Sequence, residues 1–391
     1  MNFSDIQQRD QAAVMHTYAR FPVAIRQGKN ARCVDFDGKD YIDFSSGIGV
    51  NSLGFANEGW AKAVYEQLTT LQHISNLYYT LPCIQAAELI EQKSGMRKVF
   101  FANSGAEANE GAIKTARKYS LQKYGAGRST IVSLQNSFHG RTVTTLSATG
   151  QEVFHKDFFP FTEGFRFAVA NDLEATAAQL TQDVCAVLVE LVQGEGGVLP
   201  LERDYVLGLA RLCREKDILL IVDEVQTGAG RTGSFLCFQQ FGIQPDLVTM
   251  AKGIGGGLPL GAVLFGERTA QVLQPGDHAT TFGGNPAVCA GAKYVLETMD
   301  EAFLAQVREK GDYFRQKLLT MPHVKGVAGM GLMLGIELDG VTSREVVEKG
   351  IEQGVLTLTA KAKLRLLPPL TITKEEIDQG LERLQRALAQ L

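Results

Sequence analysis

The stretch "DLVTMAKGIGGG" (residues 246–257) combines a strand pattern with an unusual ending. Its apolar run is typical of a buried strand, and the run stops at Lys252, directly before a loop of glycines. Lysine is among the side chains least often buried, and glycines cannot shield it. A lysine at the end of a core strand therefore indicates an amine with a chemical task.

Other short apolar runs surround this stretch. They are "KVFFA" (98–102), "STIVSL" (129–134), "DVCAVLVEL" (183–191), "ILLIVDE" (218–224) and "LGAVLF" (260–265). Near-continuous apolar strands are typical of a sheet covered on both faces, which is usually parallel. Two segments between these runs, "ANEGAIKTARKYSLQKY" and "DYVLGLARLCREK", have the spacing of apolar residues that is typical of helices. Because strands and helices alternate along the chain, we expect an α/β fold.

The two ends of the chain have a different pattern. Near the start, "CVDFDGKDYIDF" (33–44) predicts a hairpin that turns at Asp37 and Gly38. From about residue 296, helical spacing alternates with short strands, and the last helix opens with a capping box at Thr373 and Glu376. We therefore expect a large domain in residues 56–295 and a smaller α+β domain in residues 296–391, which the segment 1–55 joins.

Composition excludes several classes of function. The chain has 391 residues, of which 21% are charged, and a net charge of −4. This balance favours neither nucleic acid nor an anionic membrane as a partner. The most apolar run, "ILLIV" (218–222), is far too short for a bilayer, and the pattern of the first residues leads us to expect no secretory signal. We expect a cytoplasmic protein.

The cysteines and histidines do not predict a metal site. The six cysteines, at positions 33, 83, 185, 213, 237 and 289, form no C-x-x-C pair. Disulfide frameworks belong to small secreted chains, and zinc sites need closer spacing. We expect buried thiols in a reducing compartment and no bound metal.

Polar residues follow three successive apolar runs. They are Glu190, Gln193 and Glu195 after the first, Asp223, Glu224 and Gln226 after the second, and Lys252 after the third. Ligands of open α/β sheets collect outside the carboxyl ends of the strands. A single charged strand end is explained equally well by exposure to solvent, whereas three in succession favour a ligand site.

The segment "KVFFANSGAEANEGAIKTARK" (98–118) predicts a strand, a turn at Ser104 and Gly105, and a helix. The free N–H groups of a first helical turn can hold a phosphate. Plain capping by Asn103 or Ser104 explains the same pattern and is slightly favoured by spacing alone. Together with Lys252 and Asp223, however, this turn suits a phosphorylated pyridine aldehyde: the amine binds the aldehyde and the carboxylate keeps the ring nitrogen protonated. The glycines after Lys252 would then let the backbone pass close to the ring.

Six motifs then identify a family. They are "NSGAEANE" (103–110), "FHGRT" (138–142), "QGEGG" (193–197), "DEVQTGAGRTG" (223–233), "MAKGIGGGLPLGA" (250–262) and "TTFGGNP" (280–286). The order and spacing of these motifs resemble those of the class III aminotransferases, which depend on pyridoxal phosphate and have fold type I. This resemblance implies a mostly parallel central sheet in a large pyridoxal-phosphate-binding domain, beside a smaller α+β domain.

The resemblance also implies roles around the cofactor. Lys252 would bind pyridoxal phosphate covalently and carry a proton, and Asp223 would pair with the ring nitrogen. Phe138 would stack on the ring, and Thr281 would reach the phosphate of the other subunit in a homodimer. The cofactor-binding set matched in this way is Ser104, Gly105, Ala106, Phe138, Asp223, Glu224, Val225, Gln226, Lys252 and Thr281.

The implied substrates carry carboxylates. Arg141 would bind the distal carboxylate, Arg365 the α-carboxylate of glutamate, and Glu195 would pair with Arg365 in its absence; Thr280 completes the set. From spacing alone, Arg365 is an ordinary ion-pair partner. The expected reaction moves the δ-amino group of N-acetylornithine to 2-oxoglutarate in arginine biosynthesis, giving N-acetylglutamate semialdehyde and glutamate. Succinylornithine, ornithine and 4-aminobutyrate are alternative donors.

Two other readings are weaker. "GAGRTG" (228–233) matches the G-x-G-x-x-G pattern of dinucleotide-binding enzymes, but residues 223–227 separate it from its strand. A glycine-rich turn explains it better. A non-catalytic relative would need neither Lys252 nor Asp223. We interpret His139, beside Phe138, as structural.

Overall fold

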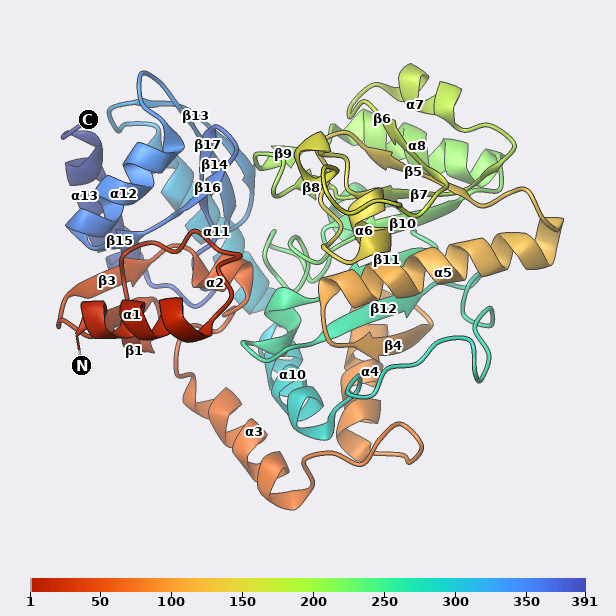
Figure 1. Cartoon of the computed structure of the whole chain (residues 1–391), viewed down its shortest axis with the longest axis horizontal. Coiled ribbons are helices and arrows are strands. Elements are labelled where there is room, and N and C mark those ends of the chain that lie inside the picture. Colours follow the sequence, from red (N-terminus) through yellow and green to blue (C-terminus); the bar gives the residue numbers. More distant parts are fainter. Residues whose placement is uncertain (1) are drawn as a thin grey trace.

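The computed structural model describes residues 2–391, and its largest unit is a seven-stranded sheet, shown at the right of Figure 1. The strand order is β4 (Lys98–Ala102), β12 (Gly261–Phe265), β11 (Leu247–Met250), β10 (Leu219–Asp223), β7 (Val184–Val189), β5 (Thr130–Leu134) and β6 (Phe165–Ala168). The five strands from β11 to β6 are parallel, whereas β12 runs antiparallel to both of its neighbours. The predicted, mostly parallel sheet is confirmed; the sequence analysis did not indicate β6 or the reversal of β12.

Both faces of this sheet are buried, as the continuous apolar runs predicted. In β10, Leu219 and Ile221 belong to a cluster that includes the apolar side of α5 (Gly105–Tyr124). Leu220 and Val222 belong to the second, larger cluster on the other face. Successive side chains of a strand point to opposite faces, so a strand covered on both sides needs an apolar residue at every position.

Helices and short turns surround the sheet. The helices are α3 (Glu58–Thr70), α4 (Leu81–Ser94), α5, α6 (Val143–Ala148), α7 (Leu173–Gln179), α8 (Arg203–Glu215), α9 (Phe238–Phe241) and α10 (Pro286–Thr298). Two 3₁₀ turns, η1 (Glu152–Phe154) and η2 (Lys252–Gly255), and the ribbon of β8 (Val192–Gln193) and β9 (Leu199–Pro200) complete this part. Across residues 2–391, no helix combines the length and the apolar character that a membrane crossing needs.

Two smaller sheets lie at the left of Figure 1, where both termini are found. One contains β1 (Ile25–Lys29), β2 (Arg32–Asp35), β3 (Asp40–Asp43) and β15 (Val355–Leu356), and the other contains β13 (Val324–Met330), β14 (Met333–Leu338), β17 (Lys363–Leu366) and β16 (Leu358–Ala360). The helices here are α1 (Phe3–Ala13), α2 (Ser46–Gly49), α11 (Glu301–Leu318), α12 (Ser343–Gln353) and α13 (Lys374–Leu388). The expected hairpin is β2 and β3, and β15 pairs with β3 in parallel. The domain limits at residues 55/56 and 295/296 stay a prediction.

The last helix begins where its capping box predicted. The Thr373 hydroxyl accepts the N–H of Glu376 at 3.2 Å, and the Glu376 carboxylate accepts the N–H of Thr373 at 3.0 Å. The same carboxylate accepts the side-chain amide of Asn30 at 2.6 Å. One local motif therefore starts α13 and also joins it to the N-terminal segment.

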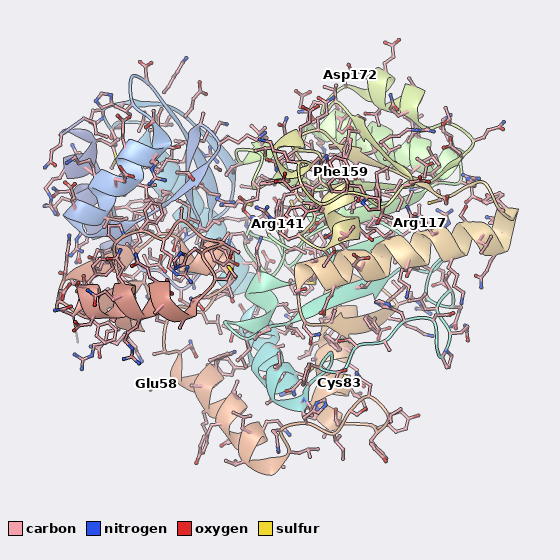
Figure 2. All side chains as sticks on the ribbon, viewed as in Figure 1. Glu58, Cys83, Arg117, Arg141, Phe159 and Asp172 are labelled. Atoms are coloured by element: carbon pink, nitrogen blue, oxygen red, sulfur yellow. The ribbon has the colours of Figure 1, made fainter. Side chains whose placement is uncertain are left out.

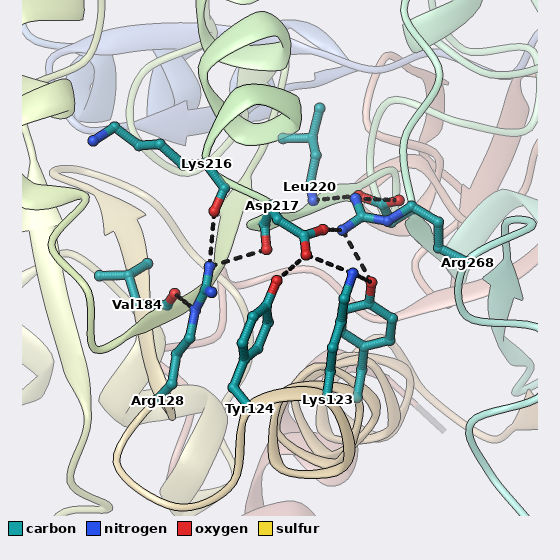
Figure 3. Close-up of polar contacts among 10 residues, drawn as sticks. Lys123, Tyr124, Arg128, Val184, Lys216, Asp217, Leu220 and Arg268 are labelled. Carbon is teal, nitrogen blue, oxygen red and sulfur yellow. Dashed lines mark hydrogen bonds and ion pairs between the residues drawn. The ribbon is translucent and has the colours of Figure 1, made fainter.

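A polar cluster around Asp217 fastens one end of the large sheet (Figure 3). Asp217 has a left-handed φ of 52° in the turn between α8 and β10. Its carboxylate pairs with Lys123 at 2.5 Å and contacts Tyr124 and Arg268. The cluster thus joins the C-terminal end of α5 to the start of β10. The other ends of the same two elements carry the first turn of α5 and Asp223.

Candidate active site

A cavity of about 470 Å³ lies at the carboxyl ends of β10 and β11, beside the first turn of α5. This volume is in the usual range for a small-molecule site. The predicted site residues that line it are Ser104, Gly105, Ala106, Phe138, Arg141, Asp223, Val225, Gln226 and Lys252. The other lining residues include Val50, Asn109 and His139, to which the sequence analysis assigned no ligand role, and Glu190, one of the polar strand ends named there. Residues that are more than 140 positions apart in the sequence thus surround one cavity.

Lys252 lies one residue beyond the end of β11, after Ala251, and opens the turn η2. Its φ of 49° is left-handed, which is uncommon for a residue with a side chain and concentrates at functional sites. Burial lowers the pKa of the Lys252 amine below its ordinary value, although the nearby Glu195 carboxylate opposes this effect. A lysine with a lowered pKa is more often neutral and is therefore a better nucleophile toward an aldehyde.

The glycines after Lys252 have a different role from the one expected. A Cβ on Gly256, whose φ is 62°, would lie 2.6 Å from the indole nitrogen of Trp60. A Cβ on Gly253 would lie 3.3 Å from the Cβ of Ala229, and of the glycines at 253–257 only Gly257 lines the cavity. The expectation that these glycines make room for a ring is therefore wrong for Gly253 and Gly256. They make room for neighbouring parts of the protein.

Asp223 is buried at the end of β10, and three donors fix its carboxylate. Its Oδ2 accepts the side-chain amide of Asn109 at 2.8 Å and lies 2.8 Å from Nδ1 of His139. Its Oδ1 accepts the N–H of Val225 at 3.0 Å. Asn109 is itself oriented, because its carbonyl oxygen accepts the hydroxyl of Thr249 at 2.8 Å. A carboxylate held by three donors stays in place as a partner for a cationic or protonated group.

His139 and Glu190 have more specific positions than the sequence indicated. His139 is buried against Asp223, and its Nε2 has no hydrogen-bond partner within residues 2–391. The Glu190 carboxylate, at the end of β7, accepts the N–H of Phe138 at 2.8 Å and that of Gly194 at 3.1 Å. Burial raises the pKa of Glu190 to about 7, against the opposing effect of His139. Glu190 therefore holds the backbone that carries Phe138 at the cavity wall.

The first turn of α5 confirms the predicted capping. The Ser104 hydroxyl accepts the N–H of Glu107 at 3.2 Å, so Ser104 is the N-cap residue. The structure also explains Gly105, because a Cβ there would lie 2.7 Å from Cγ1 of Val225. Gly105 and Ala106 line the cavity in the first turn, where backbone N–H groups have no partner inside the helix. This turn therefore suits a phosphate as well as forming a normal cap.

Arg141 stacks on two aromatic rings. Its guanidinium carbon lies 4.0 Å from the ring centre of Phe154 and 5.4 Å from that of Phe138. Figure 2 shows Arg141 on the side of the large sheet that faces the N- and C-terminal elements. Arg141 is exposed, and the structure of residues 2–391 shows neither a hydrogen bond nor an ion pair of its side chain. Its N–H edge is available to a carboxylate.

Arg365, by contrast, already has a carboxylate partner. It is buried in β17, and its two terminal nitrogens lie 2.5 and 3.3 Å from the two oxygens of Glu195. It also donates to the side-chain oxygen of Gln226, a cavity residue, at 3.2 Å. Burial acts to raise the pKa of Glu195, but the charge and the hydrogen bonds of Arg365 together outweigh it. The pKa of Glu195 is therefore lower than its ordinary value. The predicted ion pair therefore lies at the edge of the cavity.

Five predicted residues do not line the cavity: Glu195 and Arg365, which pair at its edge, and Glu224, Thr280 and Thr281. The Glu224 carboxylate is turned away and accepts the Thr227 hydroxyl at 2.6 Å and the N–H of Phe238 at 2.8 Å. Burial raises the pKa of Glu224 to about 7. The Thr280 hydroxyl accepts the side-chain amide of Asn103 at 2.9 Å, and Thr281 is exposed next to it. Within one chain, these last three residues do not contact the cavity directly.

The segment 228–233 does not open a helix, as a dinucleotide-binding motif would. Instead, Arg231 is buried there and donates to the carbonyl oxygens of Leu332 at 2.9 Å and Pro368 at 2.5 Å. The segment is a glycine-rich turn that anchors β14 and the end of β17. In the described part of the chain, residues 2–391, no group of three or more His, Cys, Asp or Glu side chains could hold a metal ion.

The cavity fits the pyridoxal phosphate that the resemblance implies. It combines an amine, a fixed carboxylate and a helical first turn, and the buried His139, whose Nδ1 contacts the carboxylate, has an unpartnered Nε2. A sequence profile described as aminotransferase class-III matches residues 13–388. The chain belongs to the class III aminotransferase family. It is therefore an aminotransferase, with the fold that the motifs predicted.

Two relatives of this class III aminotransferase match along nearly all of their length. An acetylornithine aminotransferase from Haemophilus ducreyi is 52% identical over 393 residues, which cover 100% of each chain. One from Aquifex aeolicus is 46% identical over 378 residues, or 96% of this chain and 99% of the relative.

Solved structures give the same result for this class III aminotransferase. The N-acetylornithine aminotransferase of Stenotrophomonas maltophilia has a TM-score of 0.85 at 33% identity, covering 98% of each chain. The ornithine aminotransferase of Toxoplasma gondii, crystallised with oxidised glutathione and with pyridoxal phosphate partly occupying its active site, has a TM-score of 0.93 at 33% identity. That match covers 99% of this chain and 94% of the other.

Proposed function

We propose that this class III aminotransferase uses pyridoxal phosphate to transfer the δ-amino group of N-acetylornithine to 2-oxoglutarate. The products are N-acetylglutamate semialdehyde and glutamate, so the reaction belongs to arginine biosynthesis. One observation carries the proposal: the site has two arginines in opposite states, Arg141 without a carboxylate partner and Arg365 paired with Glu195. The names of the full-length relatives support the same substrate.

The donor fits the state of the site as it stands. N-Acetylornithine has one carboxylate, far from its reacting amine, and its other nitrogen is a neutral amide. Its carboxylate matches the open edge of Arg141, and its terminal amine then extends toward Lys252. No second carboxylate of the donor competes with Glu195, so the pair between Glu195 and Arg365 persists.

The acceptor requires the other state. 2-Oxoglutarate has two carboxylates, so it engages Arg141 with the distal one and Arg365 with the one beside the reacting carbonyl. The second contact requires Glu195 to move away from Arg365, which it contacts at 2.5 Å. One cavity thus accepts two substrates of different charge, because an internal carboxylate replaces the one that the donor lacks.

The chain's own groups have separate tasks in the transfer. Bound pyridoxal phosphate supplies an electron-accepting ring next to the reacting carbon. Lys252, whose amine has a lowered pKa, would hold and move the proton that leaves the reacting carbon of the substrate. The Asp223 carboxylate, fixed by Asn109 and His139, stabilises positive charge on the ring nitrogen. The first turn of α5 would hold the phosphate, and Phe138 would limit the space for the ring.

The proposed active form is a homodimer in which Thr281 completes the site of the other subunit. Exposed apolar side chains support a dimer: Leu77, Tyr78 and Tyr79 are 85%, 64% and 99% exposed, and Phe282, next to Thr281, is 61% exposed. Asn76 donates to the carbonyl oxygen of Gly283 at 2.7 Å, so the two segments are adjacent. Exposed apolar patches of this kind mark interfaces. A cytoplasmic location is also proposed, and its support is that all six cysteines are free.

A panel of amino donors tests the substrate. N-acetylornithine, N-succinylornithine, ornithine and 4-aminobutyrate are each supplied with 2-oxoglutarate, and glutamate formation is measured. We expect the highest kcat/KM with N-acetylornithine. Ornithine has a free α-amino group in place of the amide, and 4-aminobutyrate has no nitrogen at that position, so both fit differently next to Arg141. A higher kcat/KM for ornithine or 4-aminobutyrate would refute this donor.

A further inference from the structure

Phe154 does not line the cavity, yet its ring centre lies only 4.0 Å from the guanidinium carbon of Arg141. We propose that Phe154 is a positioning residue that holds the Arg141 guanidinium ready for the carboxylate of the donor. The inference rests on the proposed function, because it concerns the arginine assigned there to the distal carboxylate.

The first step is the geometry of the stack. The guanidinium carbon lies 4.0 Å from the centre of the Phe154 ring, against 5.4 Å for Phe138. The two rings are 6.0 Å apart with an interplanar angle of 77°, so they form two walls of a corner that contains the guanidinium. A cation is attracted to the face of an aromatic ring, while the N–H groups at the edge of the guanidinium stay free to bind a carboxylate with two hydrogen bonds.

The second step is that the chain segment leading to Phe154 is fixed. Its segment is tied to the one that carries Phe138: the N–H of Gly150 donates to the Ser137 hydroxyl at 3.0 Å, and the buried side chain of Gln151 donates to the Ser137 carbonyl at 3.1 Å. The carbonyl of Gly150 accepts the N–H of Asn136 at 2.7 Å. Both walls of the corner therefore belong to one hydrogen-bonded unit.

The third step concerns what Arg141 lacks. An exposed arginine with no hydrogen bond or ion pair to residues 2–391 would sample many rotamers, and carboxylate binding would have to select one of them. A ring stacked on the guanidinium restricts that choice before the donor arrives. Without the ring, binding of a carboxylate-bearing donor should weaken, whereas an otherwise equal donor without the carboxylate should be unaffected.

The test compares two donors in the first half-reaction, which needs no 2-oxoglutarate. N-acetylornithine and N-acetylputrescine differ only in the carboxylate, and the spectral change of the holoenzyme gives kcat/KM for each. Phe154→Leu keeps apolar volume without a π face, Phe154→Met does the same with a flexible chain, and Phe154→Tyr restores the face. Phe161→Leu is the matched control, since the ring contacts of Phe161 are with His155 and Phe159.

For Phe154→Leu we expect kcat/KM for N-acetylornithine to fall about three- to thirtyfold, the range of a cation–π contact. The value for N-acetylputrescine should not change, Phe154→Tyr should recover most of the loss, and Phe161→Leu should match the wild type. In an Arg141→Ala background, Phe154→Leu should cause no further loss, because the stack is already absent.

Three results would overturn the proposal. They are an unchanged value for N-acetylornithine, an equal fall for both donors, and a further loss in the Arg141→Ala background. If the leucine variant does not fold, Phe154→Met carries the same comparison. If the wild type rejects N-acetylornithine, the proposed function fails separately, and the preferred donor and its decarboxylated analogue then test Phe154.

Discussion

Lys252 is reactive because of its surroundings and not because of its residue type. Lys310 is also partly buried, and burial lowers its pKa too, but its amine donates to the carbonyl of Leu370 at 3.0 Å outside the cavity. Lys252 lies in the cavity with Asp223, on a left-handed turn that only the surrounding structure can hold. A lowered pKa therefore does not define the site by itself; the carboxylate and the first turn of α5 do.

Replacement of Lys252 by alanine should remove covalent binding of the cofactor. We expect Lys252→Ala to reduce turnover at least about 1,000-fold, since both the nucleophile and the proton carrier are lost. Borohydride reduction of the holoenzyme, followed by peptide mass spectrometry, should find pyridoxyl phosphate on Lys252 in the wild type and no labelled peptide in the variant.

The matched control is Lys310→Ala, which removes the other lysine of lowered pKa. It should keep the label on Lys252 and most of the activity. Label on another lysine in the wild type, or normal turnover of Lys252→Ala, would disprove the assignment of the nucleophile.

Helix α5 links the two ends of the large sheet. Its first turn lies at the cavity, and its last turn contributes Lys123 and Tyr124 to the Asp217 cluster (Figure 3). Between these ends, its small side chains Ala108, Ala112 and Ala116 pack on the sheet. Because the helix is fastened along its length, the N–H groups of its first turn hold one position, which a phosphate site needs.

The first turn tolerates no added atom at Gly105. A Cβ there would lie 2.7 Å from Cγ1 of Val225, which is itself a cavity residue. For Gly105→Ala we expect roughly tenfold weaker binding of pyridoxal phosphate to the apoenzyme, because overpacking costs about 1–3 kcal/mol. Absorbance titration of the apoenzyme measures this dissociation constant.

Gly326→Ala serves as the control, because a Cβ on Gly326 would be at least 3.7 Å from its neighbours. It should bind the cofactor with wild-type affinity. Equal affinity in the Gly105→Ala variant would show that this turn is not where the phosphate is held.

The whole molecule brings distant parts of the chain to one site. Arg365 comes from β17 of a small sheet, and its partner Glu195 is 170 residues earlier. The parallel pair of β3 and β15 joins the two ends of the chain in the other small sheet. The exposed apolar side chains around residues 77–79 and 282 support the proposal that a second chain covers this surface.

Mixed dimers test whether Thr281 acts across the interface. Lys252→Ala and Thr281→Asp chains are unfolded, mixed in equal amounts and refolded; each alone should be nearly inactive. In a mixed dimer, the Lys252 of one chain meets the Thr281 of the other in one intact site. Half of the dimers are mixed, so activity should return to about a quarter of the wild-type value.

A mixture of Lys252→Ala with Ser104→Asp is the matched control. Ser104 and Lys252 line the same cavity within one chain, so no mixed dimer has an intact site and no activity should return. No recovery in the first mixture would place Thr281 in the site of its own chain, because the chain that keeps Lys252 would then lack its own Thr281.

The sequence by itself determined the parts whose information is local. Apolar runs predicted the strands near the site, the pattern Thr373 to Glu376 predicted the start of α13, and polar strand ends predicted the edge where Asp223 and Lys252 meet. Each of these depends on residues a few positions apart, whose periodicity or capping chemistry is visible in one segment.

Only the tertiary structure decided the contacts that depend on close packing between distant segments. The support of Asp223 by Asn109, the space that Gly256 leaves for Trp60, the reversal of β12 and the stack of Phe154 on Arg141 are of this kind. These contacts join parts of the chain that no local pattern relates, and they form because the folded chain leaves each side chain one place to pack.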